Sequence, residues 1–183
     1  MRPILSFLVF VLVGGAALLR AETLSPKAQA RLDHMRDEAA GWAADPVIVD
    51  AVLAQNTQLP AELGDLTQEK WEALSAKSPF LRRFLTHPAA ELIRARAGDR
   101  ISEAFLSDAQ GRKIAFLSKP TNWCHQGKPK HDLPMGGKTW QGAIEVDRSA
   151  GTLQIQISVP VLSGGTPVGS LVIGVTISTL TGE

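Results

Sequence analysis

A strict alternation of apolar and polar residues near the end of the chain constrains the fold more than any other feature. The apolar residues are Leu153, Ile155, Ile157, Val159 and Val161, and the positions between them are Gln154, Gln156, Ser158 and Pro160. This period of two predicts a β-strand with one buried face, because successive side chains of a strand point to opposite sides. The second face carries neutral polar groups, so it can line a wet cavity or simply face water.

Four more strands are predicted from similar patterns and from the turns between them. They cover 101–107, 113–118, 142–146 and 168–177. The turn Asp108–Gly111 ends in the glycine that a positive φ favours, and Ser163–Thr166 forms a tight hairpin after the alternating strand. Five strands joined in this way predict a mostly antiparallel sheet.

The chain before Gly98 has helical patterns. One helix starts near Ser25–Pro26, and its apolar residues recur at spacings of three and four on one face: Leu32, Met35, Ala39 and Trp42. Asp45–Pro46 then supplies a cap and a first-turn proline, which restart or kink the helix. The remaining predicted elements are a loop over 58–65, a helix over 67–76 and a helix over 78–98 that His87–Pro88 interrupts.

These two parts predict an α+β fold, with N-terminal helices packed on one face of a mostly antiparallel five-stranded sheet. Residues 1–21 stand apart, because Arg2 followed by an apolar run is typical of a secretory signal peptide. The run is shorter than the ~20 apolar residues that comfortably span a bilayer, and an uncleaved anchor is the alternative. Residues 22–183 suit a single domain, helical over 22–98 and sheet over 99–183.

The charge balance and the single cysteine restrict the function. The chain has 19 basic and 18 acidic residues, and loss of Arg2 and Arg20 with the signal segment changes the formal net charge from +1 to −1. A near-neutral domain argues against nucleic acid as a partner. Export implies a periplasmic, oxidising location, but Cys124 alone cannot form an internal disulfide.

The segment Lys119–His131 is the chemically densest part of the chain. Its cations and histidines are Lys119, Lys128, Lys130, His125 and His131. They predict a positive rim that binds a small carboxylate-like ligand through charge-assisted hydrogen bonds, with Trp123 as an apolar wall. Trp140 could close over such a pocket. The alternative is a solvated basic loop without a ligand.

The sequence gives less support to two other functions of this segment, metal binding and nucleophilic catalysis. Cys124, His125 and His131 have side chains that bind zinc or copper, but they lack the paired spacing of dependable sites, so we predict no metal and no cofactor. A Cys–His nucleophile is disfavoured because adjacent residues of an extended chain point in opposite directions. We therefore predict no enzyme activity.

Several segments resemble the periplasmic sensor domains of the PDC or single Cache family, in particular its stand-alone exported members. The resemblance is carried by Ala43–Asn56, Trp71, Ser78–Phe80, Ile101–Gly111, Gln156–Val161 and Gly165–Val175. It implies a long N-terminal helix on one face of the sheet and a small-molecule pocket on the other face. It also implies that two copies pair through the long helix.

The pocket loop of that family matches Thr121–Gly127 of this chain. Trp123 and Cys124 lie where the family has an aromatic pair, and Lys128 and Lys130 follow where acids are common. This departure from the family's pattern predicts a ligand of different charge.

The sequence therefore predicts an extracytoplasmic sensory domain for a small anionic ligand. The expected ligand-binding residues are Trp123, Cys124, His125, Lys128, Lys130, Trp140, Gln154 and Gln156. The signal would pass to a separate membrane protein, by family analogy a histidine kinase or a chemoreceptor. The alternatives are a periplasmic scaffold without a ligand and a metal-binding protein.

Overall fold

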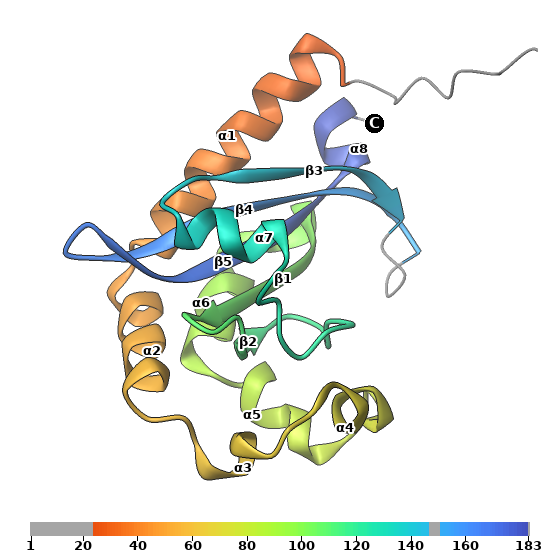
Figure 1. The fold of residues 1–183 in the computed structure, drawn as a ribbon. Helices are drawn as coiled ribbons and strands as arrows, with labels where there is room; N and C mark the ends of the chain where they lie inside the picture. Colours follow the sequence, from red (N-terminus) through yellow and green to blue (C-terminus); the bar gives the residue numbers. More distant parts are fainter. Residues whose placement is uncertain (1–23, 147–150, 183) are drawn as a thin grey trace, which may run out of the picture.

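The computed structural model describes residues 24–146 and 151–182, so the predicted signal segment over 1–21 lies outside the described residues. From residue 24 onward, eight short or medium helical segments precede the sheet (Figure 1). They are α1 (Pro26–Ala43), α2 (Pro46–Thr57), α3 (Ala61–Gly64), α4 (Gln68–Ala73), η1 (Pro79–Leu81), α5 (Arg82–Leu85), α6 (Pro88–Ala97) and η2 (Gly98–Arg100). None of the helices in these described ranges is long and apolar enough to cross a membrane.

Five strands form one antiparallel sheet. They are β1 (Ile101–Asp108), β2 (Lys113–Phe116), β3 (Trp140–Val146), β4 (Leu153–Ser163) and β5 (Thr166–Thr176). Their spatial order is β2-β1-β5-β4-β3, and each neighbouring pair is antiparallel. Two further helices, α7 (Pro129–Met135) and α8 (Ile177–Thr181), follow β2 and β5. The predicted α+β class and five-stranded sheet are confirmed.

The helix ends follow the capping signals of the sequence. Ser25 Oγ accepts a hydrogen bond from the backbone N–H of Ala28, and Asp45 Oδ1 accepts one from Val47. His87 also acts as a cap, since its Nδ1 accepts from the N–H of Ala89. Each side chain satisfies a backbone donor that the first turn of a helix leaves unpaired.

One face of the sheet packs against α1, α2 and α6. The predicted apolar face of α1 is buried, and it meets the apolar side of β4, which is Ile155, Ile157, Val159 and Val161. All four β4 side chains are at most 1% exposed. Full burial of each such side chain contributes about 1.5–3 kcal/mol, so this layer fixes which side of β4 faces α1.

The opposite face carries an aromatic cluster near β2. Trp71 is fully buried there and contacts Phe84, Phe116 and Trp123 at ring-centroid distances of 5.4–5.9 Å. Its indole N–H donates to the backbone oxygen of Pro120 at 2.8 Å. The cluster thereby attaches the segment between β2 and α7 to α4 and α5.

A β-bulge between β1 and β2 changes the side-chain directions of β2. Leu106 pairs with Ala115, but Ser107 pairs with Lys113, so Ile114 is the extra residue. Ile114 and Ala115 both contact the core beneath the helices, whereas Lys113 lies on the other face beside Ser107. Bulges commonly redirect a side chain in this way.

Some local predictions were wrong. The expected loop over 58–65 contains the one-turn helix α3. Helix α7 forms where no helix was predicted, although it holds Pro134 and is followed by two glycines. Sequence propensity disfavours a helix at α7. Contacts of α7 with β3, β4 and β5 override that preference.

A pair of glycine substitutions tests the packing of α2 on the sheet. A Cβ at Gly169 would lie 2.5 Å from the backbone oxygen of Ser107 and 2.8 Å from Val52 Cγ1, so we expect Gly169→Ala to lower the free energy of unfolding by about 1–3 kcal/mol. Gly41→Ala is the control, because nothing lies within 4 Å of its Cβ position in α1. It should stabilise the protein by about 0.5–1 kcal/mol. Urea unfolding measures both, and an equal effect of the two substitutions would contradict this packing.

Candidate functional site

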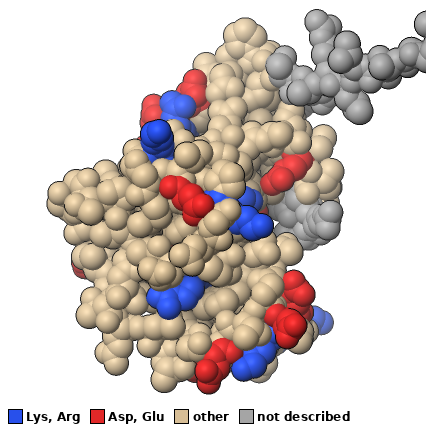
Figure 2. Space-filling model, in the orientation of Figure 1, with Lys and Arg blue, Asp and Glu red and all other residues tan. Residues whose placement is uncertain are grey.

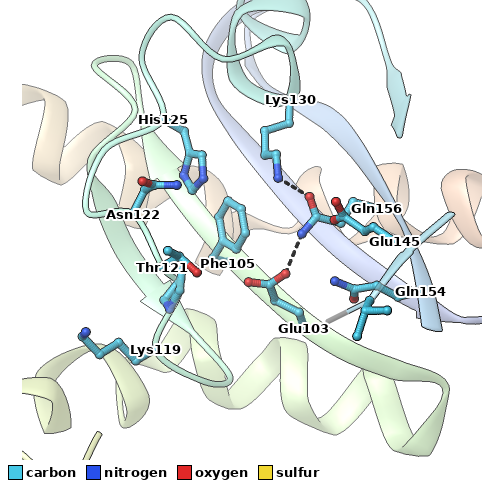
Figure 3. Close-up of a pocket in the computed structure, with 12 residues that line it drawn as sticks. Glu103, Phe105, Lys119, Thr121, Asn122, His125, Lys130, Glu145, Gln154 and Gln156 are labelled. Atoms are coloured by element: carbon cyan, nitrogen blue, oxygen red, sulfur yellow. Dashed lines mark hydrogen bonds between the residues drawn. The ribbon is translucent and has the colours of Figure 1, made fainter. Parts of the chain in front are cut away.

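A polar cavity of about 250 Å³ lies on the face of the sheet opposite α1 (Figure 3). Its floor consists of Glu103 and Phe105 from β1 and Gln154 and Gln156 from β4. These residues alternate with the side chains that face the helices, so the pleat of each strand supplies core on one side and cavity on the other. The walls are residues 119–122 and His125 from the segment after β2, Lys130 from α7, and Glu145 and Val146 from β3.

Hydrogen bonds connect the polar groups across the floor. Lys130 Nζ donates to Gln156 Oε1, and Gln156 Nε2 donates to Glu103 Oε2 at 2.6 Å (Figure 3). Gln154 Oε1 accepts from Ser102 Oγ at 2.6 Å. The amide of Gln156 thus links a cation to an anion and holds both at the cavity.

The cavity contains charges of both signs. Burial lowers the pKa of Lys130 from its ordinary value, while the carboxylates of Glu145 and Glu103 act in the opposite direction. The visible face of the molecule carries small separate groups of basic and acidic side chains instead of one extended patch of either sign (Figure 2).

His125 is fixed at the cavity wall by three different contacts. Its ring stacks on Phe105 with a centroid distance of 4.8 Å and an interplanar angle of 9°. Its backbone N–H donates to Gly111 O at 2.9 Å, and its Nδ1 contacts Lys113 Nζ. Burial, followed by the charges of Lys113 and Lys130, keeps the pKa of His125 far below its ordinary value. The ring is therefore neutral.

Gly111 allows the β1–β2 turn to contact the segment that holds His125 and Gln126. Its φ is +77°, and a Cβ there would lie 2.4 Å from the backbone nitrogen of Gln126. A larger residue would be strained and would also push the His125 segment away from the β1–β2 turn.

Lys113 is a functional candidate that the sequence analysis missed. It is fully buried, and its ammonium lies 4.6 Å from the centroid of the Phe105 ring. Burial lowers its pKa to about 7, against the opposing influence of Cys124, Asp108 and Glu103. No sequence signal marks this lysine, because its inward direction depends on the β1–β2 bulge.

Four of the eight predicted ligand-binding residues border the cavity: His125, Lys130, Gln154 and Gln156. The cavity also includes residues that the sequence analysis did not select for ligand binding, notably Glu103, Phe105, Thr121, Asn122 and Glu145. Selection of Glu103, Phe105 and Glu145 would have required knowledge of the sheet register, which brings β1 and β3 to the two sides of β5 and β4. Thr121 and Asn122 lie in the irregular segment between β2 and α7, where no period predicts the direction of a side chain.

The other four predicted residues lie away from the cavity lining. Trp123 is 4% exposed within the aromatic cluster, so Phe105 and not Trp123 supplies the aromatic surface of the cavity. Cys124 Sγ donates to the backbone oxygen of Gln110 at 3.1 Å, and Lys128 is an exposed residue at the start of α7. The Trp140 ring contacts Lys130, whose Nζ lies over it at 5.7 Å from the centroid.

The alternative metal ligands have separate partners. His131 Nδ1 lies 2.8 Å from Ser170 Oγ and its Nε2 lies 3.3 Å from Ala109 O, whereas His125 contacts Lys113. Within residues 24–146 and 151–182, no group of three His, Cys, Asp or Glu side chains is arranged to hold a metal ion.

Comparison with solved structures returns sensor and ligand-binding domains of a histidine kinase and of chemoreceptors. The sensor domain of the V. cholerae histidine kinase DctB is 18% identical, with a TM-score of 0.49 over 84% of this chain and 53% of that one. The ligand-binding domain of the Pseudomonas aeruginosa chemoreceptor PctC, solved with GABA, is 16% identical, with a TM-score of 0.47 over 84% and 57%. The corresponding domain of the Campylobacter jejuni chemoreceptor Tlp3 is 12% identical, with a TM-score of 0.47 over 85% and 56%.

The chain spans somewhat more than half the length of these solved domains. No protein-family model matches the chain, and no curated protein matches it either.

The buried cation predicts a dependence of stability on pH. Lys113 has a folded-state pKa of about 7, whereas the pKa of an unfolded lysine is ~10.4, so above pH 7 the unfolded state binds more protons. The free energy of unfolding should therefore rise with pH from 7 to 9, by up to about 1.4 kcal/mol per pH unit from this residue. Below pH 7 the lysine is charged in both states and its contribution is constant.

Urea unfolding of the wild type and of Lys113→Met at pH 7 and pH 9 measures this rise. We expect the rise to be largely lost in Lys113→Met and retained in Lys138→Met, which changes an exposed lysine. Equal rises in all three proteins would contradict a buried, titrating Lys113.

Proposed function

We propose that this cavity binds a small carboxylate-bearing molecule and that the chain is an extracytoplasmic sensory domain that leaves its ligand chemically unchanged. The observation that carries the proposal is the convergence of Lys130 and His125 on one polar cavity above the Phe105 ring (Figure 3). An ammonium group binds carboxylate oxygens through charge-assisted hydrogen bonds, which are strongest where water is partly excluded.

The volume of the cavity and the acidic residues that border it restrict the class of ligand. Its volume of about 250 Å³ is below the ~300–1,000 Å³ of pockets for drug-sized molecules, so a small metabolite fits better. Glu103 and Glu145 border the same space as Lys130. They favour a carboxylate that also carries a hydrogen-bond donor or a positive group, because a second anion near them would be repelled.

Strand β4 offers a physical route from the ligand to the rest of the domain. Gln156 borders the cavity, while its neighbours Ile155 and Ile157 lie in the core that packs against α1. Under the proposal, the ligand favours one packing of the sheet against α1 and so shifts the population of two states. A separate membrane-bound histidine kinase or chemoreceptor would receive the signal, and pairing of two copies through α1 is part of the same hypothesis.

A thermal-shift screen against small organic acids and amino acids tests the ligand class. We expect at least one carboxylate to raise the melting temperature of the wild type, and Lys130→Gln to remove most of that rise, because it deletes the charge at the cavity. Lys128→Gln is the matched control, since it removes the same charge two residues earlier, at the exposed N-cap position of α7 outside the cavity lining. Equal loss in both variants, or a ligand shift unaffected by Lys130→Gln, would contradict the placement.

A further inference from the structure

The environment of Lys113 is unusual for a buried cation, because its partners are neutral. Its Nζ lies 3.2 Å from Ser107 Oγ, 3.3 Å from Gly111 O and within hydrogen-bonding distance of His125 Nδ1. These three acceptors match the three N–H donors of an ammonium group. No acidic side chain within residues 24–146 and 151–182 forms an ion pair with it.

The nearest buried carboxylate is already engaged elsewhere. Asp108 accepts hydrogen bonds from the Gln55 side chain, from the Arg112 guanidinium, and from the backbone N–H groups of Gln110 and Arg112. The Asp108 carboxylate is therefore satisfied by these hydrogen bonds and makes no ion pair with Lys113. The ammonium instead depends on oxygen and nitrogen lone pairs and on the face of Phe105.

The same three contacts also suit a neutral lysine. A neutral amine has two N–H donors, which can serve Gly111 O and Ser107 Oγ, and one lone pair, which can accept a hydrogen bond from Nδ1–H of His125. Gain or loss of one proton on Lys113 therefore leaves no buried polar group unpaired, provided that the imidazole of His125 changes tautomer.

This tautomer change reaches the cavity through the other ring nitrogen. His125 borders the cavity, and none of the hydrogen bonds within residues 24–146 and 151–182 involves its Nε2. When a protonated Lys113 donates to Nδ1, the neutral ring carries its proton on Nε2 and offers a donor. When a neutral Lys113 accepts from Nδ1–H, Nε2 becomes an acceptor.

We propose that Lys113 is the positioning residue of the cavity: its proton fixes His125 as the Nε2–H tautomer, which donates to an anionic ligand, and loss of that proton converts Nε2 into an acceptor. The inference extends the proposed function, on which its relevance to a ligand rests. It assigns the selection of anions to a buried residue outside the cavity lining.

The surrounding charges support a neutral imidazole in both states. The titratable groups that act on Lys113 are Glu103 and Asp108 of β1, Cys124 of the neighbouring segment and Lys130 of α7. Lys128, Lys130 and His131 act on His125, together with Lys113, and all of them disfavour an imidazolium. Burial places the titration of Lys113 near neutral pH, where both states are accessible.

Nitrogen-15 NMR of the histidine rings in the full chain, without any ligand, tests this assignment. Long-range proton–nitrogen correlation spectra report which ring nitrogen is protonated, and the His125 signals are those that disappear in His125→Gln. At pH 6 we expect the Nε2–H tautomer in about tenfold excess, as a charge-assisted bond of about 1.5 kcal/mol implies. Between pH 6 and pH 9 the preference should reverse, with the same midpoint as the side-chain signals of Lys113.

Two variants separate the specific coupling from a general charge effect. Lys113→Met should abolish the pH-dependent change of tautomer, and Lys128→Met, which removes an exposed charge, should retain it. If Lys113→Met does not fold, the pH dependence of the His125 tautomer in the wild type tests the proposal by itself. A single His125 tautomer from pH 6 to pH 9, an imidazolium at pH 6, or an unchanged transition in folded Lys113→Met would each overturn the proposal. Because no ligand is used, a failed ligand screen would leave this result standing.

Discussion

The antiparallel pairing of β4 with β3 and β5 holds a strand whose side chains alternate between two different environments. Ile155, Ile157 and their apolar neighbours are fixed against the helices, and this burial determines the direction of every residue between them. Gln154 and Gln156 must therefore point to the other side. The polar floor of the cavity is a direct consequence of the apolar layer behind it, since a shift of register by one residue would exchange the two sets.

The β1–β2 bulge likewise determines which side chains face the helices and which face the cavity side, near the edge of the sheet formed by β2. It adds Ile114 to the layer beneath the helices and turns Lys113 toward Phe105 and His125. A buried cation is costly, because desolvation opposes its charge. Neutral acceptors and an aromatic face offset part of that cost at Lys113. The remaining desolvation cost lowers the pKa of Lys113 to about 7, so this lysine gains and loses its proton near neutral pH.

The sequence predicted the elements that depend on local signals. Capping by Ser25 and Asp45, the apolar face of α1 and the buried apolar side of β4 from Ile155 to Val161 are each encoded within a few residues, and all are present in the structure. Leu153, which the alternation also assigned to that side, is exposed at the start of β4. Helix α7 was missed because its own residues disfavour a helix and its stability comes from contacts with the sheet.

The candidate site was harder to predict because it combines residues from distant strands. The segment after β2 was correctly identified as chemically dense, yet its tryptophan packs into the aromatic cluster while its histidine borders the cavity. Neighbouring residues of an irregular segment have no fixed period, so their directions cannot be read from the sequence. Lys113 and Glu103 depend in addition on the bulge and on the strand register, which are properties of paired strands and not of one segment.

A crystal structure of the full chain, grown with the acid that most raises its melting temperature, shows directly whether the ligand binds in this cavity. We predict one molecule on the sheet face opposite α1, with its carboxylate within hydrogen-bonding distance of Lys130 Nζ and His125 Nε2. A ligand bound on the helical side of the sheet, or a cavity filled by the protein's own side chains while the acid binds elsewhere, would contradict it.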